Sequence, residues 1–214
     1  MVTLLLVRHG ESLYNMQRCF TGHSDIPLTE LGEKQAELTA QYLTEHFKVD
    51  AIWSSDLQRA RNTAKPCADR LGLPIHCDSD LRETNVGEWQ DRLFADVCLE
   101  YPHEIEKYRD RTIDFRFPGG ENSAEVYARA SRALARIAAE NEGKTVAVFS
   151  HGGVIRTLCR DWLGLKPEQF HDAPMATNAS VTVVRYGNGT AELLQISYDE
   201  HLKNLELIKD SQVI

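Results

Sequence analysis

The sequence has no excess of basic residues, because its 24 lysines and arginines are outnumbered by 32 aspartates and glutamates. The formal net charge is −8. A protein that binds nucleic acid usually carries a basic patch or a basic excess, so the composition argues against this class. A small anionic ligand stays compatible with the composition, since a few local arginines outweigh a distant acidic surface.

Long apolar runs are also missing. No apolar stretch approaches the roughly 20 residues of a membrane-spanning helix. The first apolar run meets Arg8 almost at once, which is not the pattern of a signal peptide. The cysteines are odd in number and lack the paired spacing of a zinc site. We expect a cytoplasmic protein with reduced thiols and no membrane partner. The cysteines are Cys19, Cys67, Cys77, Cys98 and Cys159.

Internal repeats, low-complexity tracts and linkers are absent as well, so residues 1–214 are expected to form a single domain. Short apolar segments alternate with segments of helical period, which predicts an α/β protein. Strands are predicted at 4–7, 49–53, 73–77 and 145–149, with a hairpin at 180–186 and 191–197. Helices are predicted at 29–46 with Thr29 as the N-cap, from 57, at 122–141 and from 154.

Two of the predicted strands end in a histidine that is followed by glycine. The first strand leads into Arg8-His9-Gly10, and a later strand leads into Ser150-His151-Gly152. Open α/β sheets bind ligands beyond the carboxyl ends of their strands, so both histidines are candidate site residues. A histidine in such a place serves as a base, a nucleophile or a metal ligand. Backbone donors of the helix after His151 would point at a bound anion.

The second strand has a similar ending. Ser54–Asp56 are expected to cap the following helix, whose first turn carries Arg59 and Arg61. Residues two apart point in different directions on a helix, so at most one arginine faces a site, and Arg61 is expected at the surface. Pro66 is expected to kink or interrupt this helix, because it lacks a donor and clashes with the previous turn.

Two segments of the chain read as irregular. Segment 12–28 is expected to be a loop over the end of the first strand, with Ser12, Asn15 and Thr21 able to bind an anion or to cap turns. Segment 84–120 is expected to be a lid or insertion with short helices. Its candidate lid residues, which either set substrate choice or only pack, are Phe115, Phe117, Arg109, Arg111 and Arg116.

The strand-end groups together favour one kind of ligand. Arg8, His9, Arg59 and His151 are expected to converge, with Glu83 nearby in a loop. These basic groups need an anion, and a phosphoryl group fits them better than a carboxylate. A histidine in line with a bound phosphate can attack phosphorus, and neighbouring arginines favour its neutral form. A carboxylic acid at the rim would protonate the leaving alkoxide.

These residues belong to a series of short motifs that runs through nearly the whole chain. The motifs are Leu6–Ser12 with Asn15 and Thr21-Gly22, Pro27–Gly32, Ser55–Ala60, Leu81–Glu83 with Gly87–Trp89, Pro118–Glu121 and Ser150–Gly153. In this order they resemble the histidine phosphatase superfamily, the phosphoglycerate mutase-like group. The resemblance implies a three-layer α/β/α fold with a mostly parallel central sheet. The family often has Gly-x-Trp-Glu-Gly where this chain has Gly87-Glu88-Trp89-Gln90-Asp91.

The resemblance also implies roles for individual residues. His9 is the nucleophile that becomes phosphohistidine. Glu83 is the proton donor to the leaving group and then the base for the attacking water, with Glu11, Glu88 and Glu121 as rivals. No metal and no cofactor are implied. The groups implied to bind the phosphoryl group are Arg8, Arg59 and His151, with further contacts from Asn15, Thr21, Gly22 and Gly152.

The compact segment after Glu83 and the short tail resemble the phosphatase branch. We therefore expect a metal-independent phosphomonoesterase, of the histidine acid phosphatase type, that hydrolyses small phosphorylated metabolites and releases inorganic phosphate. A cofactor-dependent phosphoglycerate mutase is the alternative. A non-enzymatic phospholigand-binding protein is less favoured, because each matched catalytic position carries a competent residue. A metallohydrolase is disfavoured, because the arginines oppose a cation.

Several alternatives stay open at the level of the sequence. Sugar phosphates, phosphoglycerates, phosphoserine and α-ribazole phosphate are all candidate substrates. Monomer and homodimer are equally compatible with the sequence.

Overall fold

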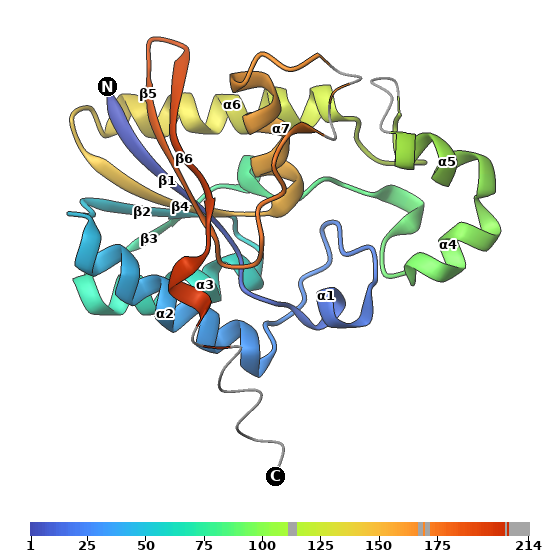
Figure 1. Ribbon diagram of the computed structural model, residues 1–214, viewed down its shortest axis with the longest axis horizontal. Coiled ribbons are helices and arrows are strands. Elements are labelled where there is room, and N and C mark those ends of the chain that lie inside the picture. Colours follow the sequence, from blue (N-terminus) through green and yellow to red (C-terminus); the bar gives the residue numbers. More distant parts are fainter. Residues whose placement is uncertain (111–114, 167–168, 170–171, 204, 206–214) are drawn as a thin grey trace.

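The centre of the computed structural model is a six-stranded sheet with the order β3-β2-β4-β1-β5-β6 (Figure 1). The structure describes residues 1–110, 115–166, 169, 172–203 and 205. Four strands are parallel: β1 (Val2–Arg8), β2 (Ala51–Ser54), β3 (Ile75–Cys77) and β4 (Thr145–Ser150). The predicted hairpin, β5 (Val181–Gly187) and β6 (Thr190–Tyr198), is antiparallel and pairs with β1.

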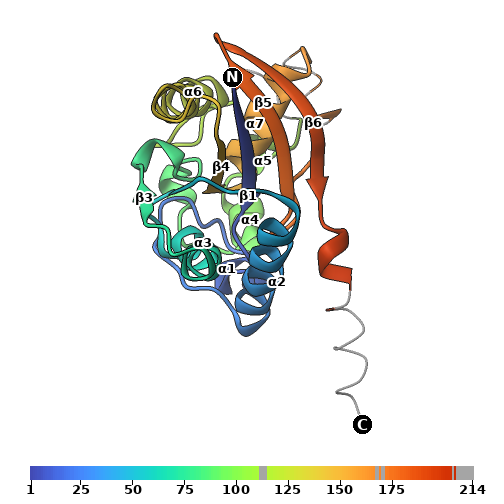
Figure 2. The same cartoon turned by 90° about the vertical axis from the view of Figure 1, so that its left-hand side faces the viewer.

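Helices cover both faces of the sheet (Figures 1 and 2). The helices α2 (Glu30–His46) and α3 (Gln58–Leu71) cover one face, and α6 (Ser123–Glu140) and α7 (Gly152–Trp162) cover the other. Side chains of β1 alternate between the two layers, because successive residues of a strand point to opposite faces. Leu4 and Leu6 pack with the α6 and α7 cluster, while Leu5 and Val7 pack with α2 and α3. The predicted three-layer α/β/α fold with a mostly parallel sheet is confirmed.

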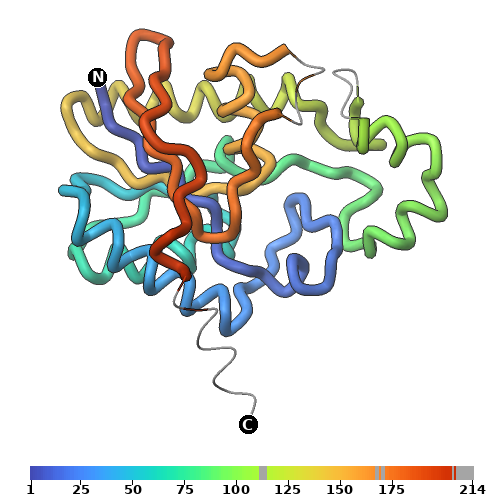
Figure 3. Tube along the Cα trace, viewed as in Figure 1, coloured from blue at the N-terminus to red at the C-terminus, as the bar shows by residue number. Residues whose placement is uncertain are grey.

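A smaller group of elements lies to one side of the sheet. It contains α4 (Phe94–Glu100) and α5 (Pro102–Asp110), the short helices that were predicted in this segment. They share an apolar cluster of their own, built around the fully buried Trp89. The loop after β1 lies beside this group (Figure 3). Phe20 donates its N–H to the Arg92 carbonyl, and the Phe20 carbonyl accepts from Asp91 N–H.

The remaining short elements include one helix that the sequence did not predict. Segment 12–28 contains α1 (Leu13–Gln17), so the prediction of a loop is wrong for these five residues. Ser12 and Asn15 form a capping box, which accounts for a helix inside a turn-rich segment. The other short elements are the 3₁₀ helices η1 (Ser79–Leu81), η2 (Gly87–Trp89) and η4 (Glu200–Leu202).

The start of α2 agrees with the prediction from the sequence, whereas the starts of α3 and α7 differ from it. Thr29 caps α2 through its side chain, as predicted, by accepting from Gly32 N–H. The prediction that Ser54–Asp56 would cap α3 is wrong, because its N-cap is Leu57, and Asp25 from the distant loop accepts the Gln58 N–H. Helix α7 begins two residues before the predicted start, at Gly152, directly after His151.

Pro66 does not interrupt α3, which continues to Leu71, so the prediction of an interruption is wrong. Proline leaves the carbonyl four residues earlier without its helical partner. Here that residue is the exposed Asn62, whose carbonyl water can solvate. The opposite face of α3, with Ala64 and Cys67 fully buried, holds the helix on the sheet.

None of the helices in the described part of the chain is both long and apolar enough to cross a membrane.

Candidate active site

The two predicted histidines lie side by side because their strands are parallel neighbours. Arg8 and Ser150 are paired in register at the carboxyl ends of β1 and β4, and His9 N–H donates to the Ser150 carbonyl at 3.0 Å. The ring centroids of His9 and His151 are 5.1 Å apart in an edge-to-face arrangement. Both rings are buried, with exposed fractions of 4% and 0%. The structure therefore brings together two residues that are 142 positions apart in the sequence.

Burial and the nearby arginines both favour neutral histidines. Burial lowers the pKa of His9 most, and the charges of Arg59 and Arg8 lower it further. The pKa of His151 is likewise lowered by burial first and then by Arg59. The Nδ1 of His9 lies 2.7 Å from the Gly10 carbonyl oxygen, which only accepts, so Nδ1 carries the proton. The lone pair of Nε2 is then available as a nucleophile or base.

Arg8 and Arg59 supply the positive charge of the site. Arg8 Nη1 donates to the Ala176 carbonyl at 2.7 Å. Arg59 is fully buried on the first turn of α3 and donates to the carbonyls of Gly22 and Ser24, at 2.9 and 2.7 Å. The pKa of Arg59 is lowered to about 10, mainly because the guanidinium is buried. Arg61 is exposed at the surface, as predicted.

Several buried nitrogen atoms at this site have no partner among the described residues. They are Nε of Arg8, Nε of Arg59, and both ring nitrogens of His151. Buried polar groups are hydrogen-bonded in the great majority of cases, so a group of unpartnered buried nitrogens at one place calls for a ligand. The surrounding charge is positive, and an anion with several acceptor oxygens therefore satisfies this site best.

The Glu83 side chain lies at the N-terminus of α7, which begins directly after His151. Its carboxylate accepts from Thr84 N–H at 2.8 Å and from Gly153 N–H at 3.2 Å. A β-carbon on Gly153 would lie only 2.5 Å from Glu83 Oε1, so a larger residue here would displace the Glu83 carboxylate from its present position. Electrostatic interactions of Glu83 with Arg8 and Arg59 connect it to the same cluster.

The three rival glutamates have other partners. Glu11 accepts a hydrogen bond from the Thr29 hydroxyl at the start of α2. Glu88 accepts from the Tyr101 hydroxyl, and Glu121 forms an ion pair with Arg129 at 2.8 Å. This geometry favours Glu83 over the rivals as the carboxyl group next to the histidines.

The further predicted phosphate contacts lie around the cluster. The amide oxygen of Asn15 accepts from Ser12, at both N–H and Oγ, and from Asn178 Nδ2. A β-carbon on Gly152 would lie 3.1 Å from Arg8 Nε, so this glycine gives the guanidinium room. The Gly22 carbonyl accepts a hydrogen bond from Arg59. The backbone carbonyl of Thr21 accepts one from Ser24 N–H.

Sequence reasoning missed the side chains that hold the loop after β1. Asn178 Nδ2 donates to the His9 carbonyl at 3.1 Å, and Thr63 Oγ1 accepts from Gly10 N–H at 3.0 Å. Gln35 Oε1 accepts from Glu11 N–H at 2.8 Å. These residues come from three distant segments with ordinary helix or turn composition, so no local signal in the sequence marks them.

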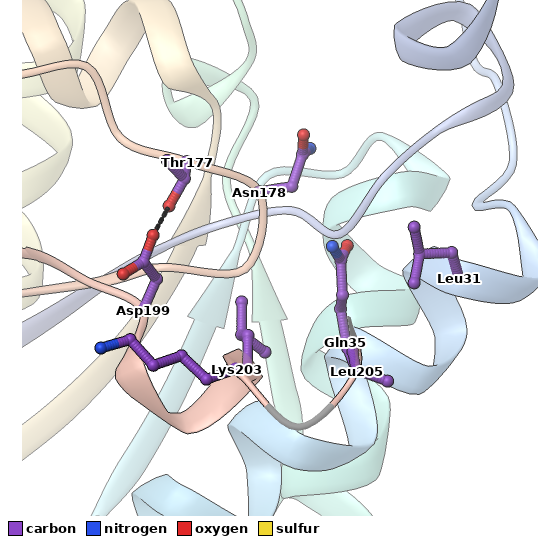
Figure 4. Close-up of a pocket in the computed structure, with 8 residues that line it drawn as sticks. Leu31, Gln35, Thr177, Asn178, Asp199, Lys203 and Leu205 are labelled. Atoms are coloured by element: carbon purple, nitrogen blue, oxygen red, sulfur yellow. Dashed lines mark hydrogen bonds between the residues drawn. The ribbon is translucent and has the colours of Figure 1, made fainter. Parts of the chain in front are cut away.

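A cavity of about 420 Å³ is lined in part by Gln35 and Asn178 (Figure 4). Residues of α2, of the segment before β5 and of the segment after β6 line it, Gln35 and Asn178 among them (Figure 4). None of the predicted site residues is among the described residues that line the cavity. Two of the lining side chains, Gln35 and Asn178, hydrogen-bond to the backbone of the loop after β1.

The structure places most of the candidate lid residues in packing and ion pairs. Phe115 and Phe117 pack against Trp89 in the aromatic cluster in tilted and edge-to-face arrangements, with ring centroids 5.6 and 5.3 Å from it. Arg116 is paired with Glu125 at 2.6 Å. The guanidinium of Arg109 lies over the Phe94 ring. Arg111 lies outside the described residues.

The structure is thus a three-layer α/β fold with two buried histidines and two arginines gathered beyond the carboxyl ends of the parallel strands. Residues 4–199 match the family model of the histidine phosphatase superfamily, branch 1. The chain belongs to this superfamily.

Comparison with individual proteins agrees. The chain is 33% identical over 203 residues to phosphoglycerate mutase-like protein 4 of Arabidopsis thaliana, covering 94% of this chain and 86% of the relative. It is 32% identical to phosphoserine phosphatase 1 of Hydrogenobacter thermophilus, with 94% and 95% covered. Among solved structures, mycobacterial glucosyl-3-phosphoglycerate phosphatase in complex with VO3 superposes with a TM-score of 0.84 at 28% identity, covering 92% of this chain and 99% of that chain.

Proposed function

We propose that this protein is a phosphomonoesterase of the histidine phosphatase superfamily that hydrolyses small phosphorylated metabolites through a phosphohistidine on His9. The observation that carries the proposal is the group of buried, unpartnered nitrogens of Arg8, Arg59 and His151 around the His9 ring. A phosphoryl group has three acceptor oxygens and close to two negative charges, which matches these donors. Relatives that are named as phosphatases support the same chemistry.

In the first step, Nε2 of His9 attacks phosphorus while the bond between phosphorus and the ester oxygen breaks. Positioning and charge stabilisation supply most of the catalysis of phosphoryl transfer. Arg8, Arg59 and His151 hold the equatorial oxygens in this scheme. Glu83 donates its proton to the leaving oxygen, so that an alcohol departs rather than an alkoxide.

In the second step, water replaces the alcohol. The Glu83 carboxylate takes one proton from water, the water oxygen attacks phosphorus, and the bond between phosphorus and Nε2 breaks. Inorganic phosphate leaves, and His9 returns to its neutral form. The hydrogen bond of Glu83 with the Gly153 N–H and its electrostatic interactions with both arginines support its role beside the phosphoryl group. No divalent cation is needed in this scheme, and the two arginines would repel one.

The described part of segment 84–120 is proposed to be the wall over the site that selects the substrate. Its helices α4 and α5 carry their own apolar cluster, separate from the two clusters of the sheet. It meets the loop after β1 through hydrogen bonds of Phe20 with Asp91 and Arg92. This contact places the segment beside the loop that follows the nucleophile.

A phosphoglycerate mutase is the second candidate, since one similar protein is named as phosphoglycerate mutase-like. Both candidates form a phosphohistidine, and they differ in the acceptor of the phosphoryl group. A phosphatase passes it to water, whereas a mutase returns it to a second position of the substrate. Products therefore distinguish the two, and phosphoenzyme formation does not.

The test is phosphate release from a panel of sugar phosphates, phosphoglycerates, phosphoserine and α-ribazole phosphate, with EDTA present throughout. Wild type is compared with His9→Ala and with the exposed His103→Ala as the matched control. We expect release by wild type and by His103→Ala, with loss of at least about 10³-fold in His9→Ala, because covalent catalysis is removed. Isomerised phosphoglycerate with little free phosphate would instead identify a mutase. Unchanged release by His9→Ala would overturn the proposed nucleophile.

A further inference from the structure

Arg129 is a buried arginine of α6 that no step of the proposed reaction uses. Its exposed fraction is 8%, and it lies on the same helix face as Val126 and Ala130. Burying a guanidinium is costly unless its donors are all paired. A charged residue on the apolar face of a helix therefore needs a reason, and its partners supply one.

Arg129 makes hydrogen bonds in two directions. On one side it holds the Glu121 carboxylate as a bidentate pair, with Nε 2.8 Å from Oε1 and Nη2 3.0 Å from Oε2. On the other side Nη1 and Nη2 donate to three carbonyl oxygens of the segment that carries Glu83. These are the carbonyls of Asp80 at 2.8 Å, Arg82 at 2.6 Å and Glu83 at 2.9 Å.

Glu121 holds the same segment from the other end. Its Oε2 accepts from Asn85 N–H at 2.8 Å, and its own N–H donates to the Asn85 carbonyl at 2.9 Å. Residues on both sides of Glu83 are thus tied to one ion pair. The Glu83 carbonyl itself has a second donor, His23 Nε2, at 2.8 Å.

The segment around Glu83 depends on these contacts for its position. It belongs to no strand of the sheet, and η1 ends at Leu81, so neither a ladder nor a helix fixes the backbone at Glu83. An arginine has five N–H donors in a rigid planar fork, which can fix several carbonyls at once. Lysine would offer a single point of attachment on a flexible stem.

We infer that the Arg129–Glu121 pair positions Glu83 as the proton donor, which makes both members positioning residues for the reaction. The inference rests on the proposed function, because it requires Glu83 to protonate the leaving group. It explains what holds the Glu83 carboxyl group in place. A shift of about 1 Å at a reacting group costs up to about 100-fold in rate.

The dependence of the rate on the leaving group distinguishes a positioning role from a purely structural one. An alkyl phosphate releases a strongly basic alkoxide and needs the acid, whereas p-nitrophenyl phosphate releases a weakly basic phenolate and needs it little. A misplaced Glu83 should therefore slow the first substrate selectively. A partly unfolded enzyme would slow both substrates by the same factor.

The experiment compares kcat/KM for glycerol 2-phosphate and p-nitrophenyl phosphate in Arg129→Gln and Glu121→Gln. The matched control is Arg136→Gln, which lies on the same helix and pairs with the side chains of Asp78 and Asp80 at the start of this segment. We expect each positioning variant to lose about 10- to 100-fold with the alkyl ester and less than about 3-fold with the aryl ester. The control should keep the wild-type ratio.

Glu83→Gln separates failure of this inference from failure of the proposed function. It should show the same selective loss, and with a larger factor, because the acid itself is gone. If Glu83→Gln is selective but Arg129→Gln slows both esters equally, the positioning role is overturned while the proposed function stands. If Glu83→Gln slows both esters equally, the assignment of the acid fails and the inference falls with it. Arg129→Lys, which keeps the charge and loses the fork, gives the same comparison if the glutamine variant does not fold.

Discussion

Acidification from pH 7.5 to 5.5 should destabilise the protein, because two of its histidines are buried in their neutral form. Burial and arginine charge lower the pKa values of His9 and His151 well below the usual range. In the unfolded chain a histidine titrates near pH 6.5, so the unfolded state takes up protons that the folded state refuses. Stability is therefore present above about pH 6.5 and is lost as the pH falls through that value.

The magnitude follows from the protons taken up. A histidine with an unfolded pKa of about 6.5 that stays neutral when folded contributes RT ln 10, about 1.4 kcal/mol, between these two pH values. Two such residues give a loss of about 2.7 kcal/mol in the free energy of unfolding. His23 and His201, whose pKa values are also lowered by burial, act in the same direction. Carboxylates such as Asp56, with a lowered pKa, contribute only below this window.

The assay is urea unfolding followed by tryptophan fluorescence at pH 7.5, 6.5 and 5.5, in buffers without phosphate. His9→Asn and His151→Asn should each reduce the pH-dependent loss by about 1.4 kcal/mol, whatever their effect on absolute stability. Replacement of the exposed His103 by glutamine serves as the control. A free energy of unfolding that stays constant over this window, or a loss that neither variant reduces, would refute the argument for neutral buried histidines.

Three further outcomes are expected. Inorganic phosphate at 100 times its dissociation constant should stabilise the fold by about 2.7 kcal/mol, seen as a rise in Tm. An equal rise in Arg59→Gln would place the phosphate elsewhere. Gly153→Ala should lower kcat by about 10- to 100-fold, because its β-carbon would lie 2.5 Å from Glu83 Oε1, and a wild-type kcat would contradict this contact. Pro66→Ala should raise the free energy of unfolding in urea by about 1–3 kcal/mol, and a decrease would mean that proline is favoured at this point of α3.

The sequence alone determined the layers of the fold and the ends of the strands that matter most. Apolar runs and helical periods are local properties, and they are sufficient to predict β1, α2, α6 and β4 with the histidines that follow the two strands. Convergence of His9 and His151 follows from parallel pairing, because the carboxyl ends of neighbouring strands meet at one edge. Arg59 was found for the same reason, on the first turn of the helix after β2.

Only the tertiary structure decided which groups support these residues. Asp25 caps α3 from a distant loop, and Asn178 holds the His9 carbonyl from the segment before β5. Such contacts join residues far apart in the chain and leave no period or spacing in the sequence. Arg129 is a further case, since nothing local in the sequence of α6 indicates its partners on the Glu83 segment. The sequence carries local preferences, and the hydrogen bonds that fix Glu83 exist only once the chain has folded.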